Sequence, residues 1–436
     1  MQKSHHGNDV ADQSVLFGDT VLKIVTHSSL IFRSRSAKAC PCLVVDIMNP
    51  ERTDRDKKAL VAAIFQHLQK GARPSQLPEL IWESHRIRVT REHASRLLWE
   101  AATSGSLRFV SDTDDLLALA LKKRFDELWG EKARFFGLPT VAPGSVDQLA
   151  VHGAAALLRI IEHRWREKLK SAGPREIRIG FSGGLTPALV LEELPKLIKG
   201  EWKVYDVPTD TYPTRITFHA LNALLGNGNP VFNPSRYFPS FGGEFPVETR
   251  FVSFPAPGVL LADEWESVRK LQGVREALYY ADKLDIILGS GGHWGAGHHT
   301  VQDYVTQSCI KDHGTPGEGV SLLDLWTTEA SSLAPEAGCV GDLFWQRVFS
   351  GAYGSTRAPR VIVPSLFQLA DLPNFIQNGT RVLLVLGPCS GCDRPKDQLL
   401  EAAIQFPTPP LITDLVVTAK TANAFLRRSH QKARAE

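Results

Sequence analysis

The sequence lacks an apolar run long enough to cross a bilayer. The longest apolar stretches, such as 382–386, fall far short of the roughly 20 residues that a membrane-spanning helix needs. The opening residues MQKSHHGNDVADQ also lack the apolar core of a secretory signal. We therefore expect a cytoplasmic protein.

Cysteine is scarce, with six residues in a chain of 436, which excludes a disulfide framework. Cys40 and Cys42, together with Cys389 and Cys392, could supply four thiolates to a zinc ion. The two pairs lie at opposite ends of the chain, so small residues in turns are the favoured interpretation. We expect no metal and no cofactor.

Charge of either sign is nearly balanced, because the formal net charge is only +3. So small a sum does not indicate nonspecific nucleic-acid binding by the whole chain, and the distribution of charge matters more. The window 86–108 holds five arginines, at 86, 88, 91, 96 and 108, against the glutamates at 92 and 100. This window alone has the net charge of the entire chain. A solvated arginine-rich surface is the alternative interpretation.

Residues 91–102 have the pattern of a short amphipathic helix. Ala94, Leu97, Leu98 and Ala101 recur at the spacing of one buried helix face. The opposite face carries the side chains of Glu92, Ser95, Arg96, Trp99 and Thr103. Thr90 can act as N-cap and Gly105 as a C-terminal stop, which limits the helix to about three turns. A helix of that length fits the major groove of DNA.

The surrounding segment, 51–112, has the order of a winged helix-turn-helix domain. Helices are expected at 57–70, around 77–84 and at 91–102, and a strand is expected at 107–110. Before this domain, residues 1–50 form an extension of unknown role with strand-like runs at 21–25 and 43–47. After it, 113–146 is expected to hold a helix at 113–129 and then a Pro/Gly-rich linker.

From 147 to 436 helices and strands alternate, which predicts an α/β domain with a doubly wound, mainly parallel sheet covered on both faces. The expected helices are 147–171, 187–199, 366–378, 396–405 and 418–427. The expected strands are 177–181, 203–207, 286–288, 361–363, 381–386 and 411–415. Residues 208–260 are expected to form an irregular insertion, and no internal repeat is present.

Three loops of this domain are candidates for ligand binding, because ligands of open parallel sheets bind beyond the carboxyl ends of the strands. The first, 180–187, follows a strand and opens a helix. It could wrap an anion with the backbone and hydroxyl donors of Ser182, Gly183, Gly184 and Thr186. The loop matches no nucleotide-binding fingerprint, and a tight turn without a ligand is the alternative.

The second loop, 288–294, brings backbone close to any ligand through Gly289, Ser290 and Gly291. The histidines at 293, 298 and 299 suggest a metal, but their spacing fits no known site, so surface histidines are favoured.

The third loop, 386–396, places Lys396 near the start of a helix, where a cation is unfavourable unless an anion lies beside it. A solvent-facing lysine is the alternative. Asp342 is expected to begin a helix as its cap, and it could also accept hydrogen bonds from sugar hydroxyls.

Taken together, these motifs resemble the SorC/DeoR-type sugar-binding transcriptional regulators of bacteria. TREHASRLLWEAATSGSLRF is similar to the recognition helix and wing of that family, and IGFSGGLT to its first phosphate loop. DIILGSG, VGDLFWQRVF, LGPCSGCDRPKDQLLEAAI and LITDLVVTAKTANAFL follow in the family's order. The resemblance implies a C-terminal domain with the fold of sugar-phosphate isomerases and deaminases that senses a phosphorylated sugar.

The working hypothesis is a non-enzymatic regulator, forming a homodimer or homotetramer, that binds operator DNA under the control of a sugar phosphate. Arg91, Ser95 and Arg96 would contact bases or phosphates, while Arg88 and Arg108 grip the DNA backbone. The effector would be held by the nine residues of the three loops and of the Asp342 segment.

Two other functions compete with this one. A sugar-phosphate isomerase or deaminase could use Asp342 or one of the three histidines as its base. The N-terminal unit could instead mediate protein contacts through an exposed Trp99.

Overall fold

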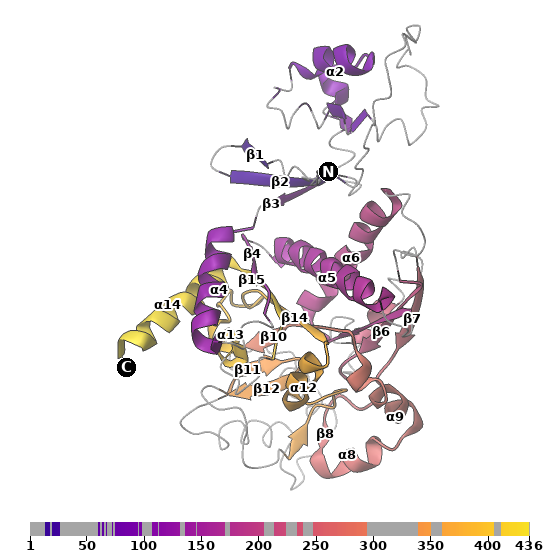
Figure 1. Cartoon of the computed structure of the whole chain (residues 1–436), viewed down its shortest axis with the longest axis vertical. Coiled ribbons are helices and arrows are strands. Elements are labelled where there is room, and N and C mark those ends of the chain that lie inside the picture. The colour runs from indigo at the N-terminus through magenta and orange to yellow at the C-terminus, as the bar shows by residue number, and fades with distance from the viewer. Residues whose placement is uncertain are drawn as a thin grey trace, which may run out of the picture. The chain divides into compact units, whose positions relative to one another are not determined.

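The computed structural model shows two compact units (Figure 1). The N-terminal unit comprises residues 1–112 and 200–206, and the C-terminal unit comprises 113–199 and 207–436. The structure describes residues 14–17, 20–26, 60–61, 63–64, 67, 72, 75–94, 96–97, 107–111, 113–130, 136–144, 146–170, 175–204, 213–223, 233–238, 247–293, 339–349, 360–404 and 411–435.

The N-terminal unit has a small hydrophobic core made by three helical segments. The described residues between 60 and 67 are helical, α2 spans Leu77–His85, and a further helix begins at Arg91. Their buried side chains are Leu60, Ile64, Leu77, Ile81, Val89, Ala94 and Leu97. The expected positions 94 and 97 thus face the core, while Leu98 and Ala101 lie outside the described residues.

Thr90 caps the helix that begins at Arg91, as its sequence predicts. The Thr90 hydroxyl accepts a hydrogen bond from the backbone N–H of His93 at 3.1 Å. The Thr90 carbonyl accepts the first helical hydrogen bond, from Ala94, at 2.9 Å. The cap satisfies one of the N–H groups that a helix start leaves unpaired.

The expected strand at 107–110 is observed as β3, Leu107–Ser111, within a three-stranded antiparallel sheet of order β1-β2-β3. β1 spans Ser14–Phe17 and β2 spans Thr20–Thr26. Val25 pairs with Arg108 and Leu22 with Ser111. The strand-like run 21–25 of the N-terminal extension is therefore the partner of β3, a pairing that the sequence did not predict.

The C-terminal unit is built on a seven-stranded sheet in which every neighbouring pair is parallel. Its strands, in spatial order, are β4 (Thr140–Ala142), β15 (Asp414–Thr418), β14 (Arg381–Leu386), β9 (Ile286–Gly289), β5 (Glu176–Phe181), β6 (Arg215–Ala220) and β7 (Glu248–Val252). The interior strand β14 is buried along 382–386, as expected for a parallel strand with both faces covered.

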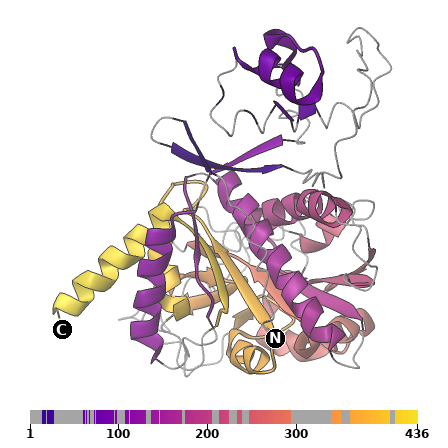
Figure 2. The same cartoon turned by 45° about the horizontal axis from the view of Figure 1, so that its top comes forward.

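Helices cover both faces of this sheet (Figure 2). One face packs against α5 (Val146–Leu169) and α6 (Leu185–Val204). The opposite face packs against α4 (Asp115–Trp129), α12 (Leu372–Gln377), α13 (Asp397–Ile404) and α14 (Ala419–Ala435). The predicted α/β fold with a mainly parallel sheet is confirmed.

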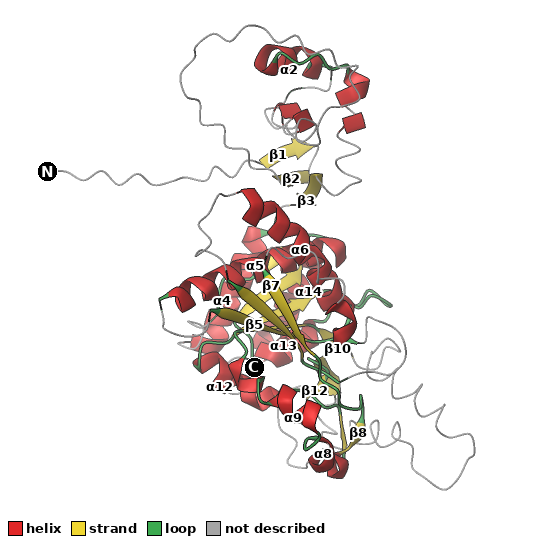
Figure 3. Cartoon of the chain, turned by 90° about the vertical axis from the view of Figure 1, so that its right-hand side faces the viewer, coloured by secondary structure: helices red, strands yellow, loops and turns green. Residues whose placement is uncertain are grey.

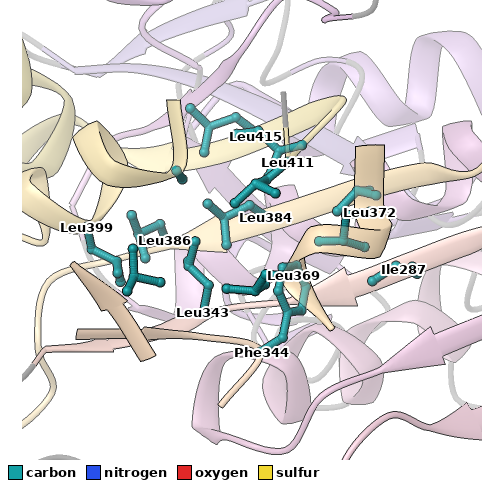
Figure 4. Close-up of a cluster of buried hydrophobic side chains, with 14 of the residues drawn as sticks. Ile287, Leu343, Phe344, Leu369, Leu372, Leu384, Leu386, Leu399, Leu411 and Leu415 are labelled. Carbon is teal, nitrogen blue, oxygen red and sulfur yellow. The ribbon is translucent and has the colours of Figure 1, made fainter. Parts of the chain in front are cut away.

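The core on the α13 side joins residues far apart in the sequence (Figure 4). Leu384 and Leu386 of β14 lie among leucines of β15, α12 and α13, and Leu343 and Phe344 close the cluster. This packing fixes the segment around Leu343 against the carboxyl end of β14 and so positions the neighbouring Asp342.

The remaining described elements are short (Figure 3). They are α8 (Ala262–Val268), α9 (Gln272–Leu278), the 3-10 turns Pro234–Tyr237, Ala281–Lys283 and Leu369–Asp371, and the antiparallel pair β8 (Leu260–Leu261) and β13 (Val361–Ile362). Among the described helices, none is long and apolar enough to span a membrane.

Several sequence predictions for this unit are corrected by the structure. Residues 208–260 are not merely an irregular insertion, because they supply β6 and β7 to the main sheet. The sequence analysis did not predict β6 as a strand, because its short apolar run lies between Pro/Gly-rich residues. The predicted strand 203–207 is wrong where it is described, since Lys203 and Val204 end α6.

The segment 113–146 carries more structure than a linker. α4 buries Leu121 and Phe125 in the main core, and β4 pairs with β15 at the sheet edge. The strand expected at 411–415 begins later, at Asp414, because Leu411 and Ile412 are buried ahead of the strand.

Candidate functional site

The candidate site lies where the strand order of the sheet changes direction, between β5 and β9. From β5 the chain continues to β6 and β7 on one side, and β9, β14 and β15 follow on the other. Open α/β sheets bind ligands at such a switch point, outside the carboxyl ends of the strands. The loops after β5, β9 and β14 meet here in a pocket lined by Val146, Gly183, Gly184, Leu185, Thr186, Pro187, Ser290, Gly291, Gly292, His293, Asp342, Trp345, Pro388, Cys389, Ser390 and Lys396.

Seven of the nine residues proposed from the sequence for effector binding line this pocket. They are Gly183, Gly184, Thr186, Ser290, Gly291, Asp342 and Lys396. The other two, Ser182 and Gly289, do not line it. The Ser182 backbone N–H is used by the Leu288 carbonyl at 3.0 Å, and a Cβ at Gly289 would lie 2.1 Å from the Phe344 ring.

The first loop brings the start of α6 to the pocket. Gly184 has a φ of +125°, a conformation that L side chains rarely adopt. Its carbonyl accepts a hydrogen bond from Ala188 at 3.2 Å, so the helix ladder begins at this residue. The backbone N–H groups of Leu185 and Thr186 have no carbonyl partner within the helix, and the positive end of the helix dipole lies beside them. This is the geometry that binds anions.

Lys396 supplies a buried cation to the same pocket. Its side chain is 9% exposed, and its ammonium donates a hydrogen bond to the Gly291 carbonyl at 2.7 Å. Burial lowers the pKa of Lys396, while Asp342, Cys389 and Cys392 oppose that shift by favouring the charged form. The Lys396 carbonyl also accepts the N–H of Leu400 at the start of α13. The solvent-facing alternative for this lysine is therefore wrong.

Asp342 does not begin a helix, so that prediction is wrong. It lies on β11 (Cys339–Leu343), which pairs antiparallel with β10 (Gly291–His293) and with β12 (Gln346–Phe349). The pairing to β10 sets Asp342 opposite Gly292. The sequence suggested a helix because the apolar residues of this segment do not alternate with polar ones, as they do in a strand with one exposed face. In the structure these apolar residues are all buried where they are described.

The turn between β11 and β12 holds Asp342 in place. Its two residues, Phe344 and Trp345, have φ values of 52° and 67°, which bulky side chains rarely adopt. Asp342 Oδ1 accepts the Trp345 N–H at 3.2 Å, and the Phe344 carbonyl accepts a hydrogen bond from the Asn222 amide at 2.9 Å. Burial of both aromatic rings and these bonds stabilise the strained turn.

The arginines proposed to contact DNA are exposed where the structure describes them. Arg88, Arg91 and Arg96 all face solvent. The Arg88 guanidinium lies 5.3 Å from the centre of the Trp82 ring, and an Arg96 nitrogen lies 3.0 Å from His93 Nδ1. Ser95 lies outside the described residues, and Arg108 is described only as backbone within β3.

No protein-family model and no curated protein sequence matches the chain. Among solved structures, the chain is similar to the full-length sorbitol operon regulator SorC from Klebsiella pneumoniae. The two are 16% identical over 86% of this chain and 99% of that chain, with a TM-score of 0.50. The chain has a SorC-like fold.

Two further structures are similar at lower TM-scores. A probable sor operon regulator from Shigella flexneri is 15% identical over 72% of this chain and 99% of that chain, with a TM-score of 0.44. A domain of a possible sugar-binding transcriptional regulator from Arthrobacter aurescens TC1 is 16% identical over 71% of this chain and 97% of that chain, with a TM-score of 0.43. The resemblance inferred from the sequence motifs agrees with the fold of the Klebsiella pneumoniae regulator.

Within this SorC-like fold, the pocket contains residues that the sequence analysis missed. The most prominent is Trp345, whose ring packs against Gly183. Two-residue hairpin turns are signalled by Asn-Gly or Asp-Gly, and Phe344-Trp345 carries no such signal. Cys389 and Ser390 also line the pocket, and their closeness to Lys396 in the sequence could have predicted this.

His293 lines the pocket at the end of β10, whereas His298 and His299 lie outside the described residues. Cys40 and Cys42 lie outside them as well. Among the described residues no group of three or more potential ligands is arranged to hold a metal ion.

Proposed function

We propose that the chain is a DNA-binding transcriptional regulator of carbohydrate metabolism whose operator affinity or assembly is controlled by a phosphorylated sugar. The observation that carries this proposal is the buried Lys396 ammonium in the same pocket as the start of α6. A buried lysine and a helix N-terminus in one small pocket both favour an anion. Such a regulator works in the cytoplasm, where its operator DNA lies.

The pocket is lined by groups of two kinds, donors that favour an anion and a carboxylate that accepts hydrogen bonds. A phosphate near Lys396 would meet the ammonium, the N–H groups of Leu185 and Thr186 and the Thr186 hydroxyl. Asp342 is a carboxylate, so it repels phosphate and accepts hydrogen bonds from hydroxyl groups. A molecule with a phosphate at one end and hydroxyls at the other satisfies both, which is the chemistry of a sugar phosphate. Ser182 and Gly289 would support the loops from beneath.

The N-terminal unit would read the DNA. Its described helical segments and the sheet β1-β2-β3 support a winged helix-turn-helix, with the helix 91–102 in the major groove. Because Ala94 and Leu97 are buried, Arg91 and Arg96 are on the accessible side of that helix. Ser95 would join them, and Arg88 and Arg108 would contact phosphates.

A thermal-shift experiment tests the effector pocket. The full chain is heated with inorganic phosphate and with a panel of sugar phosphates, and Lys396→Met is compared with Lys270→Met, at an exposed lysine of the same unit. Stabilisation by at least one sugar phosphate is expected for the wild type and Lys270→Met, and is lost in Lys396→Met. If no sugar phosphate stabilises the protein, or all three respond equally, the pocket assignment fails.

Gel shifts on the DNA upstream of the chain's own gene test the DNA-binding role. Arg96→Ala is expected to lose about 1–3 kcal/mol if Arg96 binds a guanine, or about one unit of salt slope if it binds a phosphate. Arg166→Ala, at an exposed arginine on α5, is the matched control and should bind as the wild type does. Equal affinity and equal salt slope for all three proteins would contradict the proposal.

Coupling between the two units is tested by repeating the gel shift and light scattering with the stabilising sugar phosphate. The effector can change operator affinity only through its different affinity for two states, typically by 1–3 kcal/mol. We expect a homodimer or homotetramer whose DNA affinity or size changes with the ligand.

The alternative is an enzyme that isomerises or deaminates a sugar phosphate. One observation favours this alternative. Asp342 and His293 line the same pocket, so a carboxylate and an imidazole are both available as a general base. Turnover of a sugar phosphate by the purified chain, lost in Asp342→Asn, would establish the enzyme and replace the sensing role. A role in protein contacts rests on Trp99, which lies outside the described residues.

A further inference from the structure

The loop after β14 contains two cysteines, Cys389 and Cys392, in a closed turn. The Cys389 N–H donates to the Arg394 carbonyl at 2.8 Å, and the Asp393 N–H donates to the Cys389 carbonyl at 2.8 Å. These two hydrogen bonds span the Cys-Ser-Gly-Cys sequence from both sides. An ion pair between Asp393 and Lys420 of α14 ties the same turn to the body of the unit.

The turn brings the two cysteines of the Cys-Ser-Gly-Cys sequence together. The hydrogen bond from the Asp393 N–H to the Cys389 carbonyl closes the turn around both residues, and both cysteines are free rather than disulfide-bonded. Cys389 is 6% exposed and lines the pocket, whereas Cys392 is partly exposed. Cys392 is therefore reachable from solvent, whereas Cys389 is buried in the pocket wall.

The surroundings of Cys389 favour its thiolate. Burial alone would raise the pKa of the thiol, but it is outweighed by hydrogen bonds from the backbone of Cys392 and Gly391, by the Cys392 thiol and by the Lys396 charge. The net effect lowers the pKa of Cys389 below that of an ordinary cysteine. Thiolates, not thiols, attack disulfides, so this pair is chemically activated.

A bound metal fits this pair less well than redox chemistry. No third or fourth ligand accompanies the two cysteines in the part of the chain that the structure describes. The ammonium of Lys396 is close enough to stabilise the Cys389 thiolate and would repel a metal cation. Formation of a disulfide requires only two adjacent thiols and no further ligand.

We propose that Cys389 and Cys392 are a reversible dithiol–disulfide pair in the wall of the pocket, oxidised by low-molecular-weight disulfides. This inference concerns the pair itself and does not depend on the identity of the effector. Closing the disulfide removes the thiol of Cys389, and with it the thiolate that the thiol can form, from beside Lys396 in the pocket wall. The pocket thereby acquires a second input, the thiol redox state of the cell.

The chemistry is an ordinary exchange. Cys392, the accessible thiol, loses its proton and attacks one sulfur of oxidised glutathione, so that sulfur–sulfur bond breaks and one glutathione thiolate leaves. The Cys389 thiolate then attacks the Cys392 sulfur and expels the second glutathione. One disulfide is reduced, one is formed, and two electrons pass from the protein to glutathione. The protons released by the cysteines are taken up by the two glutathione thiolates.

The test maps the thiols of the reduced full-length chain after equilibration in glutathione buffers of increasing oxidised fraction. Free thiols are alkylated in acid-quenched samples, and the peptides are identified by mass spectrometry. We expect the peptide holding both cysteines to escape alkylation and to have the mass of the unlabelled peptide less two hydrogen atoms, and to be alkylated at both positions after treatment with dithiothreitol. Free thiols at both positions across the whole series, or pairing of either one with a different cysteine, would overturn the proposal.

Variants test the order of attack. Cys389→Ser should trap one glutathione on Cys392, because nothing is left to expel it, and Cys392→Ser should take up glutathione far more slowly. The double variant Cys40→Ser/Cys42→Ser removes the other closely spaced cysteine pair and should still form the 389–392 disulfide. A trapped adduct on Cys389 rather than Cys392 would contradict the proposed order. The wild-type measurement needs no variant and holds even if one fails to fold.

Discussion

The indole ring of Trp345 lies so close to Gly183 that a Cβ built on the glycine would come within 2.3 Å of the ring carbon Cζ2. The first loop and the β11–β12 turn therefore meet with no room for a side chain between them. Both residues line the pocket, so this contact sets the distance between the first loop and the strand that carries Asp342.

Gly183→Ala is expected to destabilise the protein by about 1–3 kcal/mol, because an added methyl group must displace the buried ring. Urea unfolding measures the loss. Gly137→Ala is the control, since the nearest atom to its Cβ would be at an ordinary 3.7 Å. In the background Trp345→Leu the same alanine should cost less, and an equal cost in both backgrounds would show that the ring is not the cause.

His219 makes the stability of the protein depend on pH. It is fully buried on β6, and neither ring nitrogen has a hydrogen-bond partner among the described residues. Burial lowers the pKa of His219 to about 4, Arg178 adds to the effect, and Glu176 opposes it. Since an unfolded histidine has a pKa near 6.5, the unfolded chain takes up a proton first as the pH falls. The free energy of unfolding should therefore decrease by about 3 kcal/mol between about pH 6.5 and pH 4.

His219→Phe tests this dependence, because it keeps a ring that can pack beside Tyr280 and removes the titrating group. Its free energy of unfolding should change less over the acidic range than that of the wild type, as measured by urea unfolding at pH 7.5, 6 and 5. The same replacement at the exposed His430 should leave the wild-type slope. An unchanged slope in His219→Phe would assign the pH dependence to other groups.

Asp285 joins α5 to the sheet at the amino end of β9. Its carboxylate accepts hydrogen bonds from the Lys168 ammonium at 2.7 Å and from the Arg178 backbone N–H at 2.8 Å. Asp285→Ala should cost about 3 kcal/mol, because the partly buried Lys168 loses its carboxylate partner and the Arg178 backbone N–H loses its acceptor. Asp285→Asn keeps an acceptor and should cost less. Chemical denaturation measures both, with exposed Asp282→Ala as the neutral control.

Thr90→Ala should loosen the helix that begins at Arg91 by about 1 kcal/mol, since the hydroxyl that accepts the His93 N–H is lost. Hydrogen exchange of peptides covering 77–97 measures this locally, without contributions from the larger unit. Thr90→Ser retains the cap and should exchange almost as the wild type does. Equal protection in all three proteins would mean that the cap does not stabilise this helix.

Local sequence pattern was sufficient for much of the fold. The strand expected at 381–386 is β14 with the same bounds, and the helix expected at 113–129 is α4 with a start two residues later. The burial of these two elements is visible in their sequences. β14 is an unbroken apolar run, and α4 has apolar residues at the spacing of one helix face. Seven pocket residues were foreseeable as well, because the carboxyl ends of neighbouring parallel strands meet at one edge.

Long-range pairing was what the sequence concealed. Asp342 lies on a strand because β10, about 50 residues earlier, pairs with it, and no local signal marks the turn at Trp345. β6 and β7 are sheet strands because they continue the order begun by β5, although their neighbours are rich in glycine and proline. Such elements are decided by tertiary contacts rather than by local preference.

The pairing of β2 with β3 has a consequence for any attempt to isolate the N-terminal unit. A fragment begun at residue 51, the domain start that the sequence suggests, would leave one edge of β3 without the backbone partners that 20–26 provide. Bare strand edges recruit strands from other molecules, so this fragment should aggregate. A fragment that keeps the first 26 residues should remain in solution.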